Sequence, residues 1–128
     1  MIMSAEGLTD WMEGYRKAWE EQDPDAAEAL FSNDYAFKET PFTLPIRGPG
    51  IMRRYWEEYA VQGQREIHFG YAILAVPYDQ GIVHWRTELT LEPSGNVVHL
   101  DGIAIVKLDD DNKCIDFEQW WHRMGGNG

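Results

Sequence analysis

Residues 82–108 read IVHWRTELTLEPSGNVVHLDGIAIVKL. Apolar side chains alternate with polar ones on both sides of a central Pro93-Ser94-Gly95, and a period of two is typical of strands with one buried face. A connection this short joins two antiparallel strands. The stretch therefore predicts a long hairpin whose buried face carries Val83, Trp85, Thr87, Leu89, Leu91, Val98, Leu100, Gly102, Ala104, Val106 and Leu108.

Charges on the other face of this hairpin indicate how its two strands pair. Opposite charges on facing residues stabilise an antiparallel pair, and a shift by one residue would turn every buried side chain outward. One register satisfies both conditions. It pairs Leu91 with Asn96, Glu88 with His99 and Arg86 with Asp101.

The period of two continues before and after the hairpin, in residues 67–75 and 115–121. Because the connections are short, the four strands are predicted to form an antiparallel meander. A two-residue turn at Asp111-Asn112 would pair Lys107 with Asp116 and Asp101 with His122.

The first half of the chain shows the helical period of three and four residues instead. A helix is predicted over about residues 9–22, with Thr9 or Asp10 as its N-cap, and a short second helix begins at Asp23-Pro24. A brief strand at residues 35–37 precedes a third helix that begins near Pro49. We therefore predict an α+β fold: a cone-shaped barrel in which three N-terminal helices pack on a strongly curved, mainly antiparallel sheet. The predicted single domain spans residues 1–128, with its core at about residues 8–123.

The composition limits the classes of partner. The chain of 128 residues has the size of one ordinary domain, and 22 acidic against 11 basic residues give it a formal net charge of -11. Such a surface repels phosphate groups and anionic lipids, so we expect neither a nucleic-acid nor a membrane partner. Cys114 is the single cysteine and cannot form an internal disulfide, and residues 1–6 lack the pattern of a signal peptide. These features favour the cytoplasm.

The outer face of the predicted sheet mixes charged side chains with exposed apolar ones. A purely solvated face does not need isoleucine and tryptophan among paired charges, so this mixture indicates a second protein surface, and a homodimer is the simplest choice. The alternatives are a metal site at His84, His99 and His122, or an acid/base pair of Asp101 and His122. The residues predicted at the dimer interface are His84, Arg86, Glu88, His99, Asp101, Ile103, Ile105, Glu118, Trp120 and His122.

The inner face gathers aromatic rings from both halves of the chain. Many of them serve as core, but six tryptophans exceed what filling a small core requires, and rings with polar tips suit a pocket for an apolar small molecule. The alternative is that the rings fill the pocket themselves. The predicted lining residues are Trp19, Tyr55, Trp56, Tyr59, Phe69, Tyr71, Trp85, Thr87, Phe117, Gln119 and Trp121.

The order of these elements resembles the nuclear transport factor 2-like superfamily, especially its SnoaL-like and ketosteroid isomerase-like branches. The resemblance rests on residues 15–19, on DPDAAEALF at residues 23–31, on Arg47-Gly48 before the third helix and on residues 108–121. It implies a cone-shaped α+β barrel with a pocket at its open end, commonly in a homodimer. Members of the superfamily isomerise steroids, cyclise polyketides, hydrolyse epoxides or dehydrate substrates, and others only bind, so the fold alone does not settle the function.

The resemblance also implies two catalytic residues. The isomerase-like branch places a phenol on the first helix, where Tyr15 stands, and a carboxylate base before a proline after the first strand, where Glu39 stands. The carboxylic acid that completes the isomerase oxyanion hole is missing, because its position falls on Ala104 and Asp101 has the wrong parity. Alternatively, Glu39 is an exposed residue paired with Lys38 or Arg47, and Tyr15 belongs to the core.

The sequence thus predicts a SnoaL-like small-molecule-binding protein that acts as a cofactor-independent proton-transfer enzyme on an apolar substrate. The reaction would be that of an isomerase, a cyclase or a dehydratase, with no cofactor and no metal. The alternative is a non-catalytic dimeric binding or interaction module with a filled pocket.

Overall fold

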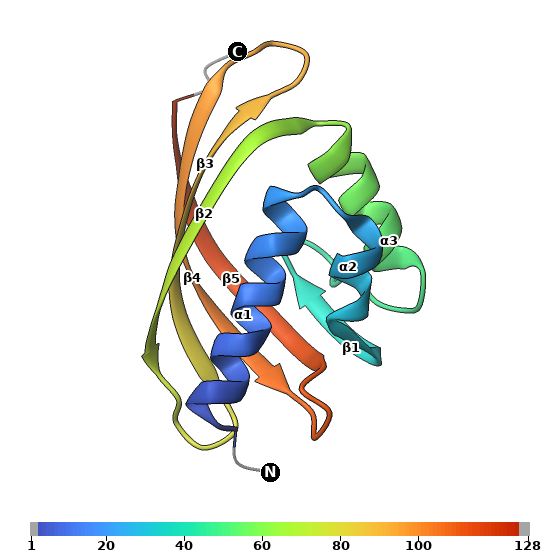
Figure 1. Cartoon of the computed structure of the whole chain (residues 1–128), viewed down its shortest axis with the longest axis vertical. Coiled ribbons are helices and arrows are strands. Elements are labelled where there is room, and N and C mark those ends of the chain that lie inside the picture. Colours follow the sequence, from blue (N-terminus) through green and yellow to red (C-terminus); the bar gives the residue numbers. More distant parts are fainter. Residues whose placement is uncertain (1–2, 126–128) are drawn as a thin grey trace.

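The computed structural model describes residues 3–125 as helices on the concave side of one curved sheet (Figure 1). The ends of the predicted domain, residues 1–2 and 126–128, lie outside the described residues. In Figure 1, α1 runs along the concave side of the sheet, and α2, α3 and β1 lie beyond it. The elements are α1 (Ala5–Glu20), α2 (Pro24–Ala29), β1 (Phe31–Lys38), α3 (Ile51–Trp56) with a π-helical continuation (Glu57–Val61), β2 (Gln64–Ala75), β3 (Gly81–Leu91), β4 (Val97–Leu108) and β5 (Cys114–Gly125).

The strands lie in the order β1-β5-β4-β3-β2. All neighbours are antiparallel except β1, which runs parallel to β5. The predicted α+β class, with three helices on a mainly antiparallel curved sheet, is confirmed. The sheet is not closed into a barrel, because β1 and β2 remain as its two edges.

The predicted strand register is confirmed on both sides of β4. Within the hairpin, Glu88 faces His99 and Arg86 faces Asp101. The last turn differs from the prediction: it runs from Asp109 to Lys113, and an irregularity beside Leu108 absorbs the extra residue. As a result, the pairs Lys107 with Asp116 and Asp101 with His122 are still those expected from charge.

The start of α1 was predicted incorrectly. Ser4 is the N-cap, and its hydroxyl oxygen accepts a hydrogen bond from the backbone N–H of Gly7 at 2.9 Å. Thr9 lies inside the helix, where its hydroxyl donates to the carbonyl oxygen of Ala5. The predicted start of α2 is confirmed, since Asp23 accepts from the N–H of Ala26.

An aromatic core joins α1 to the sheet and holds Tyr15 in place. The ring of Tyr15 stacks on Phe117 with centroids 5.7 Å apart, and Phe117 stacks on Phe37 at 4.8 Å. Trp11 stacks on the same phenol at 5.3 Å, and its indole N–H donates to the carbonyl oxygen of Leu30. All four rings are buried, so the phenol ring of Tyr15 cannot turn away from the interior of the sheet.

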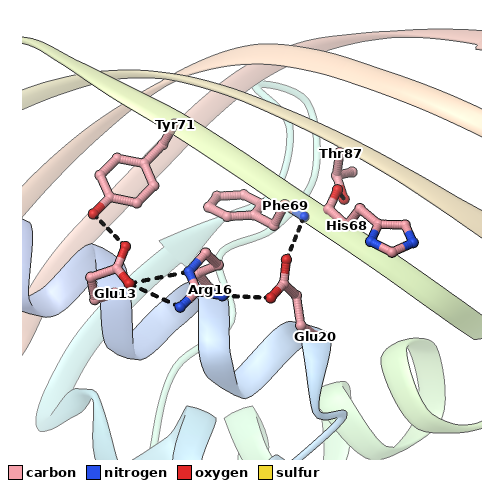
Figure 2. A network of polar contacts seen from close by, with 7 residues as sticks. All are labelled: Glu13, Arg16, Glu20, His68, Phe69, Tyr71 and Thr87. Carbon is pink, nitrogen blue, oxygen red and sulfur yellow. Dashed lines mark hydrogen bonds and ion pairs between the residues drawn. The ribbon is translucent and has the colours of Figure 1, made fainter.

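A polar network fixes how α1 is rotated against β2 (Figure 2). Arg16 lies between Glu13 and Glu20 and contacts both carboxylates. Glu13 accepts a hydrogen bond from the hydroxyl of Tyr71 at 2.7 Å, and Glu20 accepts one from the backbone N–H of Phe69 at 2.9 Å. Because these contacts attach the outward side of α1 to an edge strand, the opposite side of the helix faces the inside of the fold.

No helix among residues 3–125 is long and apolar enough to cross a lipid bilayer. Cys114 is buried in the core as a free thiol, and burial raises its pKa.

Candidate functional site

A cavity of about 170 Å³ lies between the helices and the inner face of the sheet. Its wall combines aromatic rings, aliphatic side chains from β3 and β4 and a few polar groups. The lining residues are Tyr15, Trp19, Phe37, Glu39, Tyr55, Trp56, Tyr59, Ala60, Gln64, Trp85, Leu89, Leu91, Val98, Leu100, Gln119, Trp121 and Arg123.

Glu39 enters this wall because it directly follows β1. The strand pairs in parallel with β5, where Lys38 faces Glu118, and Glu39 is the next residue along. Its carbonyl oxygen accepts a hydrogen bond from the indole N–H of Trp121 at 3.0 Å. The side chain is partly buried, and the structure shows no ion pair to it among residues 3–125, since Lys38 instead lies 3.7 Å from Glu118.

Tyr15 contributes its phenol from the middle of α1. The residue is only 6% exposed, and burial raises the pKa of its hydroxyl. The nearby carboxylate of Glu39 raises this pKa further, because its negative charge disfavours a phenolate. The hydroxyl therefore remains a hydrogen-bond donor at neutral pH.

Tyr55 is the third polar group of the site, and like Tyr15 it lies near Glu39. Burial raises the pKa of its hydroxyl well above the ordinary value, and the charge of Glu39 adds to the effect. From the sequence, Tyr55 is expected only as a lining residue. Its place next to Trp56 on the same helix indicates that the residue lies near the cavity. Periodicity does not show where its hydroxyl points, so the approach to Glu39 could not be predicted. The structure thus brings one carboxylate and two phenols together.

Seven of the predicted lining residues lie in the wall: Trp19, Tyr55, Trp56, Tyr59, Trp85, Gln119 and Trp121. Four others lie elsewhere. Phe117 is buried in the aromatic core, and α1 covers Phe69 and Tyr71. The hydroxyl of Thr87 donates to the carbonyl oxygen of His68 rather than to the cavity.

The remaining polar atoms of the wall differ in whether they have partners. The indole N–H of Trp19 donates to the side-chain oxygen of Gln64 at 2.8 Å. The indole N–H groups of Trp56 and Trp85 are fully buried and have no hydrogen-bond partner in the described part of the chain. Gln119 is 8% exposed and adds an amide to the wall from β5.

A sequence model of the SnoaL-like domain matches residues 12–117. The chain belongs to the SnoaL-like domain family. No curated protein sequence matches it. The predicted resemblance is therefore confirmed at the level of the family, part of the nuclear transport factor 2-like superfamily.

Solved structures with the same fold as this SnoaL-like domain include three enzymes. The epoxide hydrolase/cyclase-like enzyme SalBIII, linked to pyran ring formation in the polyether salinomycin, is 18% identical with a TM-score of 0.76 and 89% of each chain covered. A type 2 hexachlorocyclohexane dehydrochlorinase (LinA) is 10% identical with a TM-score of 0.77, covering 95% of this chain and 88% of the other. A Δ5-3-ketosteroid isomerase from Mycobacterium sp. is 14% identical with a TM-score of 0.75, covering 93% and 98%. At these identities the likeness shows the fold alone.

The SnoaL-like domain has one carboxylate in the described wall of the cavity. Ala104 is buried on the inner face and pairs with Gln119 across the strands. Asp101 lies on the outer face, as its parity predicts, where it is 2.8 Å from His84 and 3.4 Å from Arg86. Since Asp101 does not line the cavity, no second acid assists Glu39 there.

The outer face of the SnoaL-like domain keeps the mixed character seen in the sequence. Glu88 and His99 approach to 3.6 Å, and Trp120 is 44% exposed. Residues 3–125 contain no group of three or more His, Cys, Asp or Glu side chains placed to hold a metal ion. The three histidines of the alternative metal site therefore do not form one within this chain.

Proposed function

We propose that this SnoaL-like domain is a cofactor-independent proton-transfer enzyme that acts on a small, mainly apolar carbonyl compound. The observation that carries the proposal is the position of the Glu39 carboxylate, which lies in the wall of an aromatic cavity near the buried phenol of Tyr15 and the partly buried phenol of Tyr55. The three enzymes that share the fold, a cyclase-like enzyme, a dehydrochlorinase and an isomerase, support a proton-transfer reaction.

The geometry supports a simple proton-transfer step. Glu39 takes a proton from the carbon next to the carbonyl group. The electron pair of the broken C–H bond forms the C=C bond of an enolate, and the π pair of the C=O bond moves onto the carbonyl oxygen. Tyr15 donates a hydrogen bond to this developing oxyanion, with Tyr55 as a second donor. The carboxylic acid formed on Glu39 then returns the proton to a carbon atom, which completes an isomerisation. The same first step begins an elimination or a ring closure.

The size of the cavity limits the substrate. An engineered apolar cavity of ~150 Å³ holds benzene, and the volume here is about 170 Å³. A compound with about one ring fits this space, and a four-ring steroid is larger than it. We therefore propose a substrate smaller than that of the ketosteroid isomerase with which the fold is shared.

The second candidate is a binding domain without chemistry. The unfilled volume supports a ligand in the cavity, in contrast to the expectation that the rings fill it. Binding without catalysis differs from the proposed function in one measurable property, the exchange of a substrate proton.

We also propose a homodimer through the outer sheet face, which exposes Trp120 among charged residues. A buried and unpaired thiol at Cys114 is compatible with the proposed cytoplasmic location.

The test is to replace Glu39 by Gln and to follow deuterium uptake from D₂O into one-ring ketones by NMR. A general base contributes roughly 10²–10⁴-fold to a rate, so we expect the variant to lose exchange by that factor. Glu58→Gln is the matched control, because Glu58 is exposed and does not line the cavity. An unchanged exchange rate in a Glu39→Gln variant that still binds the ketone contradicts the catalytic proposal.

A further inference from the structure

The cavity wall consists largely of aromatic rings, and these rings meet at steep angles. Trp56 stands at 90° to Tyr15, with centroids 5.5 Å apart, and at 79° to Trp19 at 6.0 Å. Tyr55 and Tyr59 meet at 46° with centroids 5.0 Å apart. A ligand in a space bounded in this way meets ring faces from more than one direction.

The wall offers ring faces rather than indole donors. The N–H groups of Trp56 and Trp85 are fully buried, so a molecule in the cavity does not reach them. The indole N–H of Trp19 is already bound to Gln64. Ring faces carry the negative part of the aromatic quadrupole, and they attract cations.

The wall of the cavity carries one acidic side chain, Glu39, and one basic side chain, Arg123, within a strongly acidic chain. Glu39 is the only acidic residue among the described residues of the wall, and no basic side chain in the described chain forms an ion pair with it. Its potential reaches the hydroxyls of Tyr15 and Tyr55, whose pKa values it raises. Arg123 is the one basic residue in this wall, and it is exposed. The chain as a whole carries a formal net charge of -11, which attracts cations toward its surface.

We propose that this cavity binds a small organic cation, a tertiary or quaternary ammonium compound whose charged head lies among the rings beside Glu39. The proposal rests on the same cavity as the proposed function, but it concerns binding and not proton transfer. A quaternary ammonium head needs no hydrogen-bond acceptor, because π faces and one carboxylate stabilise it. A hydroxyl or carbonyl group on the same ligand would bind the amide of Gln119, which is buried and lines the cavity.

The volume agrees with a ligand of this class. A cavity of about 170 Å³ accommodates an ammonium head with three methyl groups and a short polar arm. Phosphate esters and carboxylates of equal size meet Glu39 and the acidic surface, so we expect them to be excluded.

The test compares two probes of the same shape, choline and its uncharged isostere 3,3-dimethylbutan-1-ol, by titration of the tryptophan fluorescence. We expect choline to bind at least tenfold more tightly than the alcohol, and acetate not to bind. Glu39→Gln should remove most of this preference, whereas Glu58→Gln should leave it unchanged. Trp56→Phe keeps a ring but weakens the attraction to a cation, so it should lower the affinity for choline several-fold and that for the alcohol little.

Equal binding of the two probes, or tighter binding of the alcohol, overturns the proposal. Failure of choline to bind at tens of millimolar also overturns it. The outcome is separate from that of the proposed function, because proton exchange is measured on uncharged ketones. A cation preference without exchange contradicts the proposed function alone, and exchange without a cation preference contradicts this inference alone.

Discussion

The indole N–H of Trp121 donates a hydrogen bond to the carbonyl oxygen of Glu39 at 3.0 Å. The bond joins β5 to the residue that follows β1, so it holds the backbone of the candidate base against the sheet. We expect Trp121→Phe to keep the ring and to lose the bond, which lowers the free energy of unfolding by about 1 kcal/mol. Proton exchange should fall by ~10–100-fold through poorer positioning of Glu39. Denaturant unfolding and NMR exchange measure the two effects, and a stable variant with unchanged exchange would show that the bond does not position the carboxylate.

Replacement of Tyr15 by Phe tests the proposed donor. The ring stacks on Phe117 and Trp11 in either case, so we expect the fold to remain. Loss of one donor to a developing oxyanion costs roughly 10²–10³-fold in rate, and we expect the loss in kcat rather than in KM. Tyr35→Phe serves as a control, because the hydroxyl of Tyr35 donates to the carbonyl oxygen of Gly48 and does not line the cavity. Equal activity of Tyr15→Phe and the wild type would remove Tyr15 from the mechanism.

The titration of Tyr71 makes the stability of the fold depend on pH in the alkaline range. Burial raises its pKa to about 12, and the hydrogen bond to Glu13 adds to the effect. The folded protein therefore holds this proton in a range where the unfolded chain loses it, between an ordinary value of ~10 and about 12. By linkage the contribution of Tyr71 to stability is complete below the lower value and is lost as the pH rises through this range. Urea unfolding from pH 8 to 11.5 should show a smaller decline in Tyr71→Phe than in the wild type, and identical slopes would contradict this assignment.

Gly102 provides the room that the ring of Trp85 occupies. A Cβ atom at position 102 would lie 3.0 Å from Cε2 of Trp85, 2.8 Å from Cβ of Trp121 and 2.6 Å from the carbonyl oxygen of Trp120. We expect Gly102→Ala to lower the free energy of unfolding by about 1–3 kcal/mol through overpacking. It should also weaken ligand binding, because Trp85 lines the cavity. Gly70→Ala is the control, since a Cβ at position 70 meets nothing within 4 Å; equal loss of stability in both variants would contradict the prediction.

The proposed homodimer is tested by sedimentation. At micromolar concentration the wild type should have twice the chain mass of 14.8 kDa. Trp120→Glu should reduce it to one chain mass, because a carboxylate at this exposed position would lie in an apolar part of the interface. Glu118→Gln is the control, because it also changes one charge on the outer face. If this variant stays dimeric, a change of charge alone does not explain the loss in Trp120→Glu. A wild-type protein that sediments as a monomer rules out this interface.

Much of the sheet could be predicted because its signals are local. Alternation in residues 82–108 marks the strands, and facing charges such as Arg86 and Asp101 select the register. The length of β1 could not be predicted in this way. The strand extends over Phe31–Lys38, whereas the expected strand covered only residues 35–37. Its partner is β5, where Phe31 faces Cys114, and a pairing so distant in sequence leaves no local pattern.

The sequence shows which side chains lie on the inner face of the sheet, but not which of them reach the cavity. Strand parity shows which face a side chain occupies, and it placed Trp85 and Gln119 correctly on the inner face. Parity does not show what lies above that face. The helix α1 covers Phe69 and Tyr71, and the hydroxyl of Thr87 is taken by a backbone carbonyl, so these three inner residues do not line the cavity. The role of Tyr55 depends on the direction of its hydroxyl, which only the packed structure shows.

The parallel pairing of β1 with β5 has a consequence for synthesis on the ribosome. The residues that anchor Glu39 belong to opposite parts of the chain, since Lys38 pairs with Glu118. Helices and the β2–β3 hairpin can form during translation, but until β5 has emerged β1 has only its isolated bridge between Phe37 and Ile46. The nascent domain therefore holds its candidate base next to a strand that lacks its main partner, and the proposed site is complete only when the final strand docks.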